Sequence, residues 1–580
     1  MQLLPHSISG FIKKNMKKNY PYIFEYLLFL FIEIFPSQVI PQNSYIHTDR
    51  NCYVSGDRAF VKIYQPASVV RQTNEQTLRV DMLNAEGRFV QGELIKMQKG
   101  LASGYFSIPD TLATGAYQLR VYQQPDDPLE ANPTLAIKYL FVSNRFGKNE
   151  PIYDSMLLPR ESSSLLPDQG LQVCELQLSH DTLGIRKKMQ MNLSLVPESV
   201  NTIYASVSVR PVSTKELEME QRNVAKSTLQ PSANTATRKV IPGIKIQGTL
   251  LTNSTKTPVT DAVVFLSFQD TLLRLKYDLV DHSGQFVFYL NNCFGMQTVY
   301  FSAYLYPSLE PLKDIKFQIT DPFMASQLFT PGEVLCYEAS SDTLNILKSV
   351  IAKAYNTSCF TEMDVPVRDS FSFEQNYLSG IMTNVVAPDD YVTLPDFEQI
   401  AIEILPFLRY KKWDGSWRIS VIDGKNEVIR YNPLVFVDGV PLLEPQLLFN
   451  WGTSRIKKVE IKSQPRFFGD LYFEKGLVFI WTKEQNFWSQ NSSSYIQEVE
   501  LPFYQKPIQF IFPDYSKNTN FQQPDFRQTL YWEPNVELSS TKQSKLNFYT
   551  SDEKGDFEVE VEGITNKGQP VYFRKVFTVE

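Results

Sequence analysis

The feature that most constrains this chain is a short-range alternation of apolar and polar residues. In the stretch LRVDM, the apolar residues are Leu78, Val80 and Met82. The residues between them, Arg79 and Asp81, are charged. Successive side chains of a strand point to opposite faces, so a period of two predicts a half-buried β-strand. Similar bursts recur between glycine- and proline-containing turns, a pattern typical of β-sandwiches, and the sequence therefore predicts a mainly β fold.

The composition agrees with a β-rich chain of several domains. The 40 phenylalanines and 30 tyrosines favour strands, because aromatic side chains fit a pleated, half-buried surface. At about 150 residues per domain, a chain of 580 residues is expected to contain about four domains. The net charge of −6 is mild, and no long basic run follows the first twenty residues, which argues against nucleic acid as a partner.

A basic start and a short apolar run mark the first 42 residues. Four lysines precede a run that ends at Phe35, an order typical of a secretory signal. Glu25 and Glu33 interrupt the run, which is also short for a membrane span. Residues 1–42 are therefore predicted to be an export segment, with a buried amino-terminal helix as the alternative. Export predicts a location in the periplasm or at the outer-membrane periphery.

The stretch YIHTDRNCYVSGDRAFVKIY begins the first predicted sandwich, residues 43–144. A Thr-Asp pair is followed by an aromatic residue, a Gly-Asp pair and an apolar strand. The residues that carry this pattern are Thr48, Asp49, Tyr53, Gly56 and Asp57. The pattern resembles the opening of the macroglobulin-type sandwich of alpha-macroglobulins and of many exported bacterial proteins. The resemblance implies an Ig-like β-sandwich.

Two further sandwiches are predicted downstream. Residues 145–213 echo the first opening, with His180-Asp181 in place of the Thr-Asp pair, and indicate a second related sandwich. Residues 214–240 are polar and poor in large apolar side chains, so they are predicted to be a linker. Residues 241–325 contain short strands and turns, and they resemble the carboxypeptidase regulatory-like domain at Pro258, Ala262, Gly284 and Phe286. That resemblance implies a small, non-catalytic β-sandwich.

Helical periodicity appears in two places. In SDTLNILKSVIAKAYN, the apolar residues fall on one face and Ser341 can cap the amino-terminal end. Residues 326–390 are therefore predicted to form a helical connector. A shorter helix is predicted from Pro395 through Leu405, with the proline in its first turn.

Residues 391–490 are predicted to form a small α+β unit. The stretch YNPLVFVDGVPLLEP places Asp438-Gly439 between two apolar runs, which is a strong signal for a two-residue hairpin turn. Together with the segments that follow, it resembles the plug domain of TonB-dependent receptors. The residues that match the plug motif in order are Asp438, Gly439, Ile456, Val459, Glu460, Gly469, Gly476 and Thr482. Lys475-Gly476 stands where the plug family has Gly-Gly.

No receptor barrel is expected after this plug-like unit. A barrel of about 22 strands needs more than about 200 residues, and 98 residues follow Thr482. In DFEVEVEG, apolar residues from Phe557 to Val561 alternate with glutamates, which predicts a strand with one apolar and one acidic face. Residues 491–580 are therefore predicted to form a carboxy-terminal Ig-like sandwich.

The sequence contains no motif for catalysis, cofactor binding or metal coordination. Cys174 and Gln177 have the spacing of the internal thioester of protease-trapping macroglobulins, but the alternation around them predicts a strand. Neither histidines nor cysteines show metal-ligand spacing, and the cysteines predict no disulfide framework, although one or two bridges stay open. The histidines are His6, His47, His180 and His282, and the cysteines are Cys52, Cys174, Cys293, Cys336 and Cys359.

The order of these parts resembles a group of exported macroglobulin-like proteins of Gram-negative bacteria. These proteins carry a regulatory-like sandwich and a plug domain without a barrel. The prediction is a non-catalytic envelope protein that acts as an accessory or scaffold through contacts with envelope or outer-membrane proteins, including a TonB-dependent uptake system. Two alternatives stay open. One is a macroglobulin-like protease inhibitor with residues 214–240 as bait, and the other is a glycan-binding or glycan-processing protein.

Overall fold

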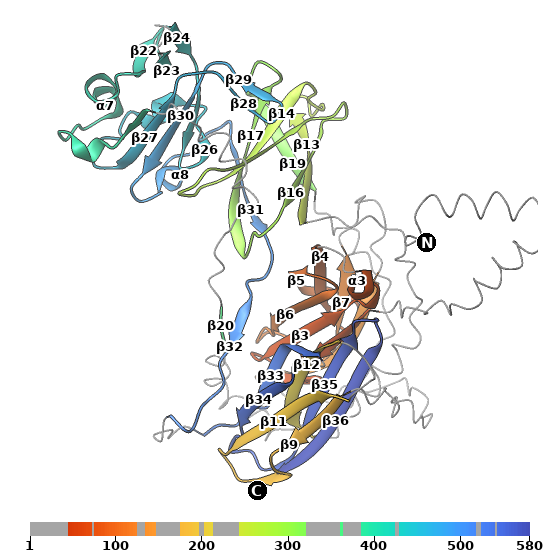
Figure 1. Ribbon diagram of the computed structural model, residues 1–580. Helices are drawn as coiled ribbons and strands as arrows, with labels where there is room; N and C mark the ends of the chain where they lie inside the picture. The colour runs from red at the N-terminus through yellow and green to blue at the C-terminus, as the bar shows by residue number, and fades with distance from the viewer. Residues whose placement is uncertain are drawn as a thin grey trace, which may run out of the picture.

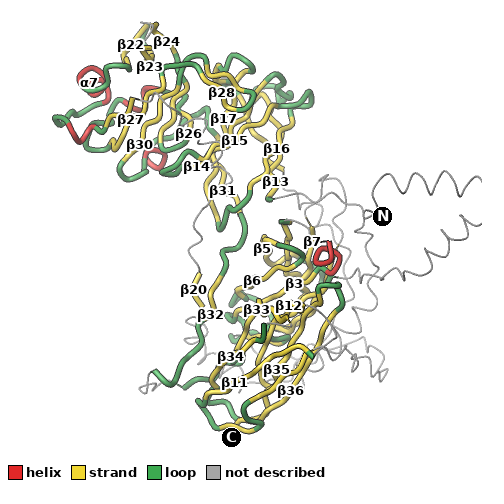
Figure 2. The backbone as a smooth tube through the Cα atoms, in the orientation of Figure 1, coloured by secondary structure: helices red, strands yellow, loops and turns green. Residues whose placement is uncertain are grey.

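The computed structural model of this protein consists mostly of β-strands, which confirms the predicted fold class (Figures 1 and 2). The predicted export segment, the predicted linker and the predicted helix after Ser341 lie outside the residues that the structure describes. No helix within the described part of the chain is both long and apolar enough to cross a membrane. The described residues are 44–71, 75–123, 134–146, 174–196, 202–212, 243–320, 360–362, 384–423, 428–517, 524–539 and 542–580.

The first sandwich contains two sheets, with the strand orders β1-β3-β6 and β2-β8-β7-β4-β5. Leu78, Val80 and Met82 of β4 lie in its core, as their alternation predicts. Asp81 departs from the pattern, because it is also buried and accepts a hydrogen bond from Nε of Arg79 at 2.7 Å. The elements are β1 (Tyr45–Thr48), β2 (Cys52–Val54), β3 (Arg58–Tyr64), α3 (Pro66–Arg71), β4 (Gln76–Leu83), β5 (Phe89–Met97), β6 (Leu101–Ser107), β7 (Gly115–Gln123) and β8 (Thr134–Ser143).

A second sandwich, which we call the closing sandwich, combines two segments that are far apart in the sequence. Strand β12 lies between β33 and β35, where Ala205 faces Val536 and Val207 faces Val561. The strand orders are β10-β36-β35-β12-β33 and β34-β11-β9. The elements are β9 (Cys174–Leu178), β10 (Thr182–Leu183), β11 (Lys188–Leu195), β12 (Thr202–Pro211), β33 (Tyr531–Ser539), β34 (Ser544–Tyr549), β35 (Gly555–Thr565) and β36 (Pro570–Val579).

The prediction of two separate sandwiches at 145–213 and 491–580 is therefore wrong. The earlier segment supplies the four strands β9 to β12, and the apolar faces of these strands are covered by β33 to β36. Met191 of β11, for example, lies in one core with Phe557 and Phe577. Alternation identifies a strand but does not say which distant strand will pair with it.

The third sandwich also includes a distant strand. β31 joins the sheet β15-β14-β17-β18 by pairing with β17, so that Val499 faces Val299. The other sheet has the order β16-β13-β19. Residues 497–502 thus belong to this sandwich and not to the closing one. The elements are β13 (Ile244–Thr252), β14 (Ala262–Phe268), β15 (Arg274–Leu279), β16 (Gln285–Leu290), β17 (Met296–Leu305), β18 (Glu310–Pro311), β19 (Ile315–Thr320) and β31 (Gln497–Pro502).

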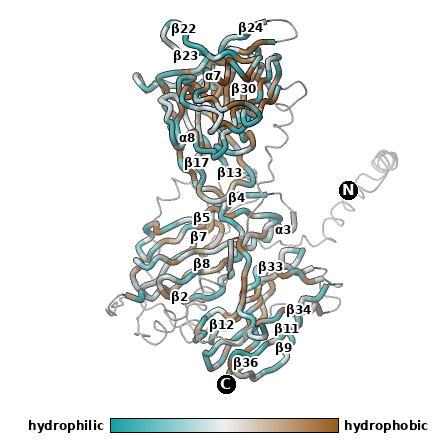
Figure 3. Tube along the Cα trace, turned by 90° about the vertical axis from the view of Figure 1, so that its left-hand side faces the viewer, coloured by the Kyte–Doolittle hydropathy of each residue, from teal (hydrophilic) through white to brown (hydrophobic). Residues whose placement is uncertain are grey.

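An α+β unit over residues 384–490 contains a five-stranded sheet of order β21-β27-β30-β25-β26. Asp438 and Gly439 have φ angles of 48° and 84° between β25 and β26, which confirms the predicted hairpin turn. A short helix, α7, forms inside the predicted stretch, and Asp396 caps it by accepting a hydrogen bond from the backbone N of Gln399 at 2.8 Å. The hydropathy colouring of Figure 3 shows apolar residues along the central strand β30.

The α+β unit also contains a three-stranded sheet, β22-β23-β24, and a hairpin, β28-β29. Its elements are β21 (Asn384–Val386), η3 (Pro388–Asp390), α7 (Phe397–Glu403), β22 (Leu408–Trp413), β23 (Ser416–Asp423), β24 (Val428–Tyr431), β25 (Leu434–Val437), β26 (Val440–Pro441), η4 (Pro445–Leu448), β27 (Ile456–Lys462), β28 (Arg466–Phe468), β29 (Leu471–Phe473), β30 (Leu477–Thr482) and α8 (Phe487–Gln490).

The four units form two lobes (Figure 1). The third sandwich and the α+β unit make the upper lobe, and Phe265 and Tyr304 of the sandwich share a core with Phe436 and Phe479 of the α+β unit. The first and closing sandwiches make the lower lobe.

A strap of residues 503–512 connects the two lobes. The hydroxyl of Tyr504 lies 2.7 Å from Oγ1 of Thr77, and both residues are buried. The Gln505 side chain accepts a hydrogen bond from the backbone N of Tyr105 at 2.8 Å. Within the strap, β32 (Ile508–Phe510) pairs with β20 (Phe360–Glu362). The strap therefore holds the first sandwich against the upper lobe.

Candidate functional site: the joint and pocket between the first and closing sandwiches

The macroglobulin-type motif residues lie together on β1 and β2 and in the two turns that connect β1, β2 and β3. Oδ1 of Asp49 accepts a hydrogen bond from the backbone N of Phe60 at 2.9 Å and one from the hydroxyl of Tyr53 at 2.8 Å. Asp49 is completely buried, and Thr48 is buried beside it on β1. The carboxylate therefore fixes the turn to strand β3.

Gly56 and Asp57 form the second of these turns, between β2 and β3. Gly56 has a φ of +88°, and a side chain there would collide with Asp110 and Arg145. Oδ2 of Asp57 accepts a hydrogen bond from the backbone N of Val54 at 3.0 Å and pairs with the guanidinium of Arg50 at 3.2 Å. The structure thus brings the five motif residues together, and their contacts hold the backbone of the turn.

The end of β1 and the turn that follows it dock on the closing sandwich. Oγ of Ser208, on β12, donates a hydrogen bond to the backbone O of Asp49 at 2.7 Å. The hydroxyl of Thr529 donates to Oδ2 of Asp49. The His47 ring packs on Trp532 of β33 with 5.0 Å between ring centroids. These buried contacts between the two sandwiches form what we call the polar joint.

Inside the polar joint, Ser206, His47 and Glu560 are arranged in the order of a hydrolase triad. Nδ1 of His47 lies 2.6 Å from Oγ of Ser206, and Nε2 lies 3.4 Å from a carboxylate oxygen of Glu560. All three residues are almost completely buried, and Oγ of Ser206 also lies 2.8 Å from the hydroxyl of Tyr64. Because a substrate cannot approach a buried Oγ, we assign this group to the packing of the two sandwiches.

Two arginines neutralise the acidic part of the polar joint. Arg210 contacts Glu558 at 2.7 Å and Glu560 at 2.9 Å, and Arg574 contacts the same two carboxylates at 3.1 and 3.4 Å. Burial alone would raise the pKa of Glu560, but the charge of Arg210 and the contact with His47 hold that pKa well below its ordinary value. Glu560 is therefore a buried, charged member of an ion-pair network.

The same place holds the one three-residue group with metal-ligand potential found in the described part of the chain. Ligand atoms of His47, Glu560 and Glu562 lie within 4.8 Å of one another. The guanidinium of Arg210 lies 2.9 Å from Glu560 and already neutralises this carboxylate, which a metal ion would otherwise do. The donor set therefore fits an internal ion-pair network better than a metal ion.

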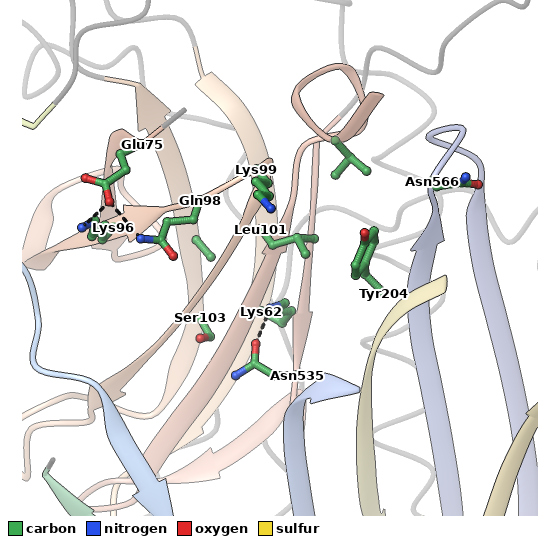
Figure 4. Close-up of a pocket in the computed structure, with 12 residues that line it drawn as sticks. Lys62, Glu75, Lys96, Gln98, Lys99, Leu101, Ser103, Tyr204, Asn535 and Asn566 are labelled. Atoms are coloured by element: carbon green, nitrogen blue, oxygen red, sulfur yellow. Dashed lines mark hydrogen bonds and ion pairs between the residues drawn. The ribbon is translucent and has the colours of Figure 1, made fainter. Parts of the chain in front are cut away.

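A pocket of about 720 Å³ opens beside the polar joint, between the two sandwiches (Figure 4). Its walls come from both: β3, β5 and β6 lie on one side, and β12, β33 and the turn after β35 lie on the other. The lining contains three lysines, one glutamate and several amides and hydroxyls. The lining residues are Lys62, Val69, Glu75, Lys96, Gln98, Lys99, Leu101, Ala102, Ser103, Tyr204, Asn535 and Asn566.

Lys62 is the buried cation of this pocket. Its side chain is 3% exposed, and Nζ donates a hydrogen bond to Oδ1 of Asn535 at 2.8 Å. Burial lowers the pKa of Lys62 to about 8, and Glu533 opposes that shift. Within the described residues no carboxylate forms an ion pair with Lys62. A buried lysine without an ion-pair partner is unusual, and it marks the pocket as a candidate binding site.

The plug-like motif residues hold the α+β unit together. The Asp438 carboxylate accepts hydrogen bonds from the backbone N and the hydroxyl of Thr482 at 2.7 and 2.6 Å. Burial raises the pKa of Asp438, although the bonds from Thr482 oppose the rise. Ile456 and Val459 are buried in the core of the unit. This pair of bonds ties the hairpin turn to the end of β30, 44 residues away.

Of the remaining motif residues, Glu460 lies within β27, and Gly469 and Gly476 lie in turns. Glu460 accepts a hydrogen bond from the indole of Trp481 at 3.1 Å. Gly469 and Gly476 have φ angles of 56° and 82°, which favour glycine. A side chain at Gly469 would collide with the Tyr277 hydroxyl of the third sandwich. The structure therefore spreads the eight plug-like residues over one structural unit and does not gather them into a single pocket.

The Cys174–Gln177 pair does not have thioester geometry. Both residues lie on β9, with Cys174 buried and Gln177 exposed, because residues three apart on a strand face opposite sides. Burial raises the pKa of the Cys174 thiol to about 11. No disulfide bond involves Cys52, Cys174 or Cys293 within the described part of the chain, and Cys336 and Cys359 lie outside the described residues. Of the histidines, His180 is exposed and bonds Ser179 next to it.

The pocket was not predicted from the sequence. Its signal is present in RAFVKIY, where Ala59, Val61 and Ile63 point into the first sandwich's core. Lys62 therefore lies on the other face, between Phe60 and Tyr64. Two aromatic neighbours at i±2 indicate that this outer face is covered. A lysine on a covered face is unusual, and it is therefore the sequence signal for the pocket.

Neither a known protein family nor a curated protein matches this chain. Solved structures to which it is similar include Salmonella alpha-2-macroglobulin reacted with methylamine, at 10% identity and a TM-score of 0.15, covering 93% of this chain and 23% of that one. Escherichia coli alpha-2-macroglobulin activated by porcine elastase matches at 9% identity and a TM-score of 0.22, covering 93% and 43%.

An adhesin of Yersinia pseudotuberculosis matches 48% of this chain and 58% of its own length, at 11% identity and a TM-score of 0.12. This chain thus spans less than half the length of the two macroglobulin chains. TM-scores this low do not establish a common arrangement of domains, and the β-sandwich assignment depends on the strands themselves.

Proposed function

We propose that this protein is a non-catalytic, exported envelope protein that acts as an accessory or scaffold through contacts with other proteins. The observation that carries this proposal is the number of exposed apolar side chains on the α+β unit. Of the 21 large apolar side chains that are exposed among the described residues, nine belong to residues 384–490. They are Val385, Tyr391, Val392, Ile402, Trp413, Tyr431, Phe449, Phe467 and Tyr472.

One of these side chains, Val385, lies on a strand at the edge of a sheet. β21 is the end strand of its sheet and pairs only with β27 among the described strands. Val385 on β21 is 55% exposed, and Val392 shortly after it is 70% exposed. An edge strand with apolar neighbours can accept a strand from a partner through main-chain hydrogen bonds. The resemblance to receptor plugs supports a component of a TonB-dependent outer-membrane uptake system as that partner.

Cross-linking in intact envelopes followed by purification tests this proposal. The wild-type chain should recover a TonB-dependent outer-membrane protein, and Val385→Lys with Val392→Lys should abolish the recovery by charging the sheet edge. Ile185→Lys in the closing sandwich is the matched control, because Ile185 is also an exposed apolar residue. Recovery of no envelope protein, or equal recovery by both variants, contradicts the proposal.

A macroglobulin-like protease inhibitor is the second candidate, and the macroglobulin-type turn at Asp49 favours it. The strand geometry of Cys174 speaks against a thioester in the described part of the chain. Mixing the protein with several proteases decides between the candidates. Trapped protease after cleavage of the chain would support the inhibitor, and free, fully active protease would exclude it.

A further inference from the structure

The pocket between the first and closing sandwiches has the size and chemistry of a small-molecule site. A volume of about 720 Å³ lies within the usual range for ligand pockets, which is about 300 to 1,000 Å³. Its lining combines the apolar side chains of Val69, Leu101 and Ala102 with several polar groups. A few polar groups around an apolar surface are typical of sites that orient one ligand.

The charge of the lining is positive. Lys62, Lys96 and Lys99 face one acidic residue, Glu75. Lys96 is already paired, since its Nζ lies 2.7 Å from Glu75 and 2.6 Å from Oδ1 of Asn292. Lys62 and Lys99 are left with no carboxylate partner among the described residues. Two unpaired ammonium groups around one cavity favour an anion there.

Hydroxyl and amide groups also line the pocket. They belong to Ser103, Tyr204, Asn535 and Asn566. Hydroxyls and amides exchange hydrogen bonds with the hydroxyl groups of a ligand, so this lining suits a ligand that carries hydroxyls as well as negative charge.

We propose that this pocket binds a small anionic ligand rich in hydroxyl groups, with its acidic group at Lys62 and Lys99 and its hydroxyls toward Asn566 and Tyr204. A saccharide that carries a carboxylate or a phosphate has this chemistry. Both sandwiches contribute to the wall, so a bound ligand also tightens the contact between them. The pocket is separate from the α+β unit. The proposal of a ligand site is therefore independent of the proposed scaffold function.

Isothermal titration calorimetry on the whole chain tests the site with four probes. Digalacturonate carries carboxylates, glucose 6-phosphate carries a phosphate, lactose is neutral, and inorganic phosphate lacks hydroxyl-bearing carbons. We expect saturable binding of digalacturonate or glucose 6-phosphate, and the stronger of the two identifies the acidic group. Lactose and inorganic phosphate should bind at least about tenfold more weakly.

Variants of single lysines locate the binding. Lys99→Glu should weaken the binding about tenfold or more, because it places a like charge beside the acidic group. Lys256→Glu is the matched control, since both lysines are exposed turn residues with φ angles of 51° and 58°. Lys62→Met should weaken binding as well, and equal circular dichroism spectra of all variants show that folding is unchanged.

Four results would overturn the proposal. The first is that neither acidic saccharide binds, and the second is that Lys99→Glu and wild type bind with equal affinity. The third is that lactose binds as tightly as the acidic saccharides, and the fourth is that inorganic phosphate does so.

Discussion

Asp49 and Asp438 are both buried, and each accepts hydrogen bonds from groups on a distant part of the chain. Asp49 connects the turn after β1 to β3 and to Thr529, and Asp438 connects its hairpin turn to Thr482. A buried carboxylate needs such donors, because its desolvation is otherwise unfavourable by several kcal/mol. Both residues belong to motifs that are visible in the sequence. In the structure, each of them connects a turn to a distant part of the chain through hydrogen bonds.

Asp438→Ala is expected to destabilise the α+β unit by about 2 to 4 kcal/mol, because two buried donors of Thr482 lose their acceptor and alanine disfavours positive φ. Asp438→Asn should lose less, since asparagine keeps one acceptor oxygen and tolerates this backbone conformation. Chemical denaturation followed by tryptophan fluorescence measures both. Equal loss in the two variants would contradict the assigned role of the hydrogen bonds.

Because of Lys62, the free energy of unfolding of the lower lobe is expected to change with pH in the alkaline range. Its pKa is about 8 in the folded protein and 10.5 in the free side chain, so the unfolded state binds more protons between these values. Stability therefore rises as the pH increases from about 8 to about 10.5, by on the order of 3 kcal/mol from this group. Charged and titratable groups close to Lys62 are Glu533, Lys96, Lys99, Glu75, Tyr64 and, across β1, His47.

Lys62→Met should consequently stabilise the protein at pH 7 by about 1 to 3 kcal/mol and remove this rise. Urea unfolding at pH 7, 9 and 10 measures the effect, with Lys256→Met as a control for an exposed lysine. A variant that is less stable than wild type at pH 7 would show that the charge of Lys62 stabilises the folded state.

At the scale of elements, single strands and turns are predictable from the sequence, and pairing partners are not. Alternation identifies β4 and β35, and Asp438-Gly439 identifies its hairpin, because these signals arise within a few neighbouring residues. β12 and β31 show the same kind of alternation as other strands, yet they pair with strands far away in the sequence. The pocket escapes prediction for the same reason, since its two walls come from β3 and β33.

A substitution at Val499 of β31 tests how much one such long-range pair, β31 with β17, contributes to stability. Val499→Asp places a charge against the core of the third sandwich and should destabilise it by about 2 to 3 kcal/mol. Amide hydrogen exchange over residues 296–301 of β17 should become faster. Glu500→Lys is the control on the exposed face of the same strand, and its exchange should match wild type. Unchanged protection of β17 in Val499→Asp would mean that β31 contributes little to this sheet.

At the scale of the whole molecule, the order of units in space differs from their order in the sequence. The chain forms the first sandwich, half of the closing sandwich and the whole upper lobe, and then returns through the strap to complete the closing sandwich (Figure 1). Among the described residues, the strap is a chain segment that leads from the upper lobe back to the closing sandwich. Completion of the closing sandwich therefore depends on strands that follow the upper lobe in the sequence.

A cysteine-pair experiment tests this central claim most directly. Val207 of β12 and Val561 of β35 face each other in the closing sandwich, at a spacing that suits a disulfide bond. Under oxidising conditions, Val207→Cys with Val561→Cys should give a cross-linked peptide pair by mass spectrometry, whereas Val207→Cys with Val299→Cys should not. Free thiols at both positions in the first variant would contradict a closing sandwich assembled from the two distant segments.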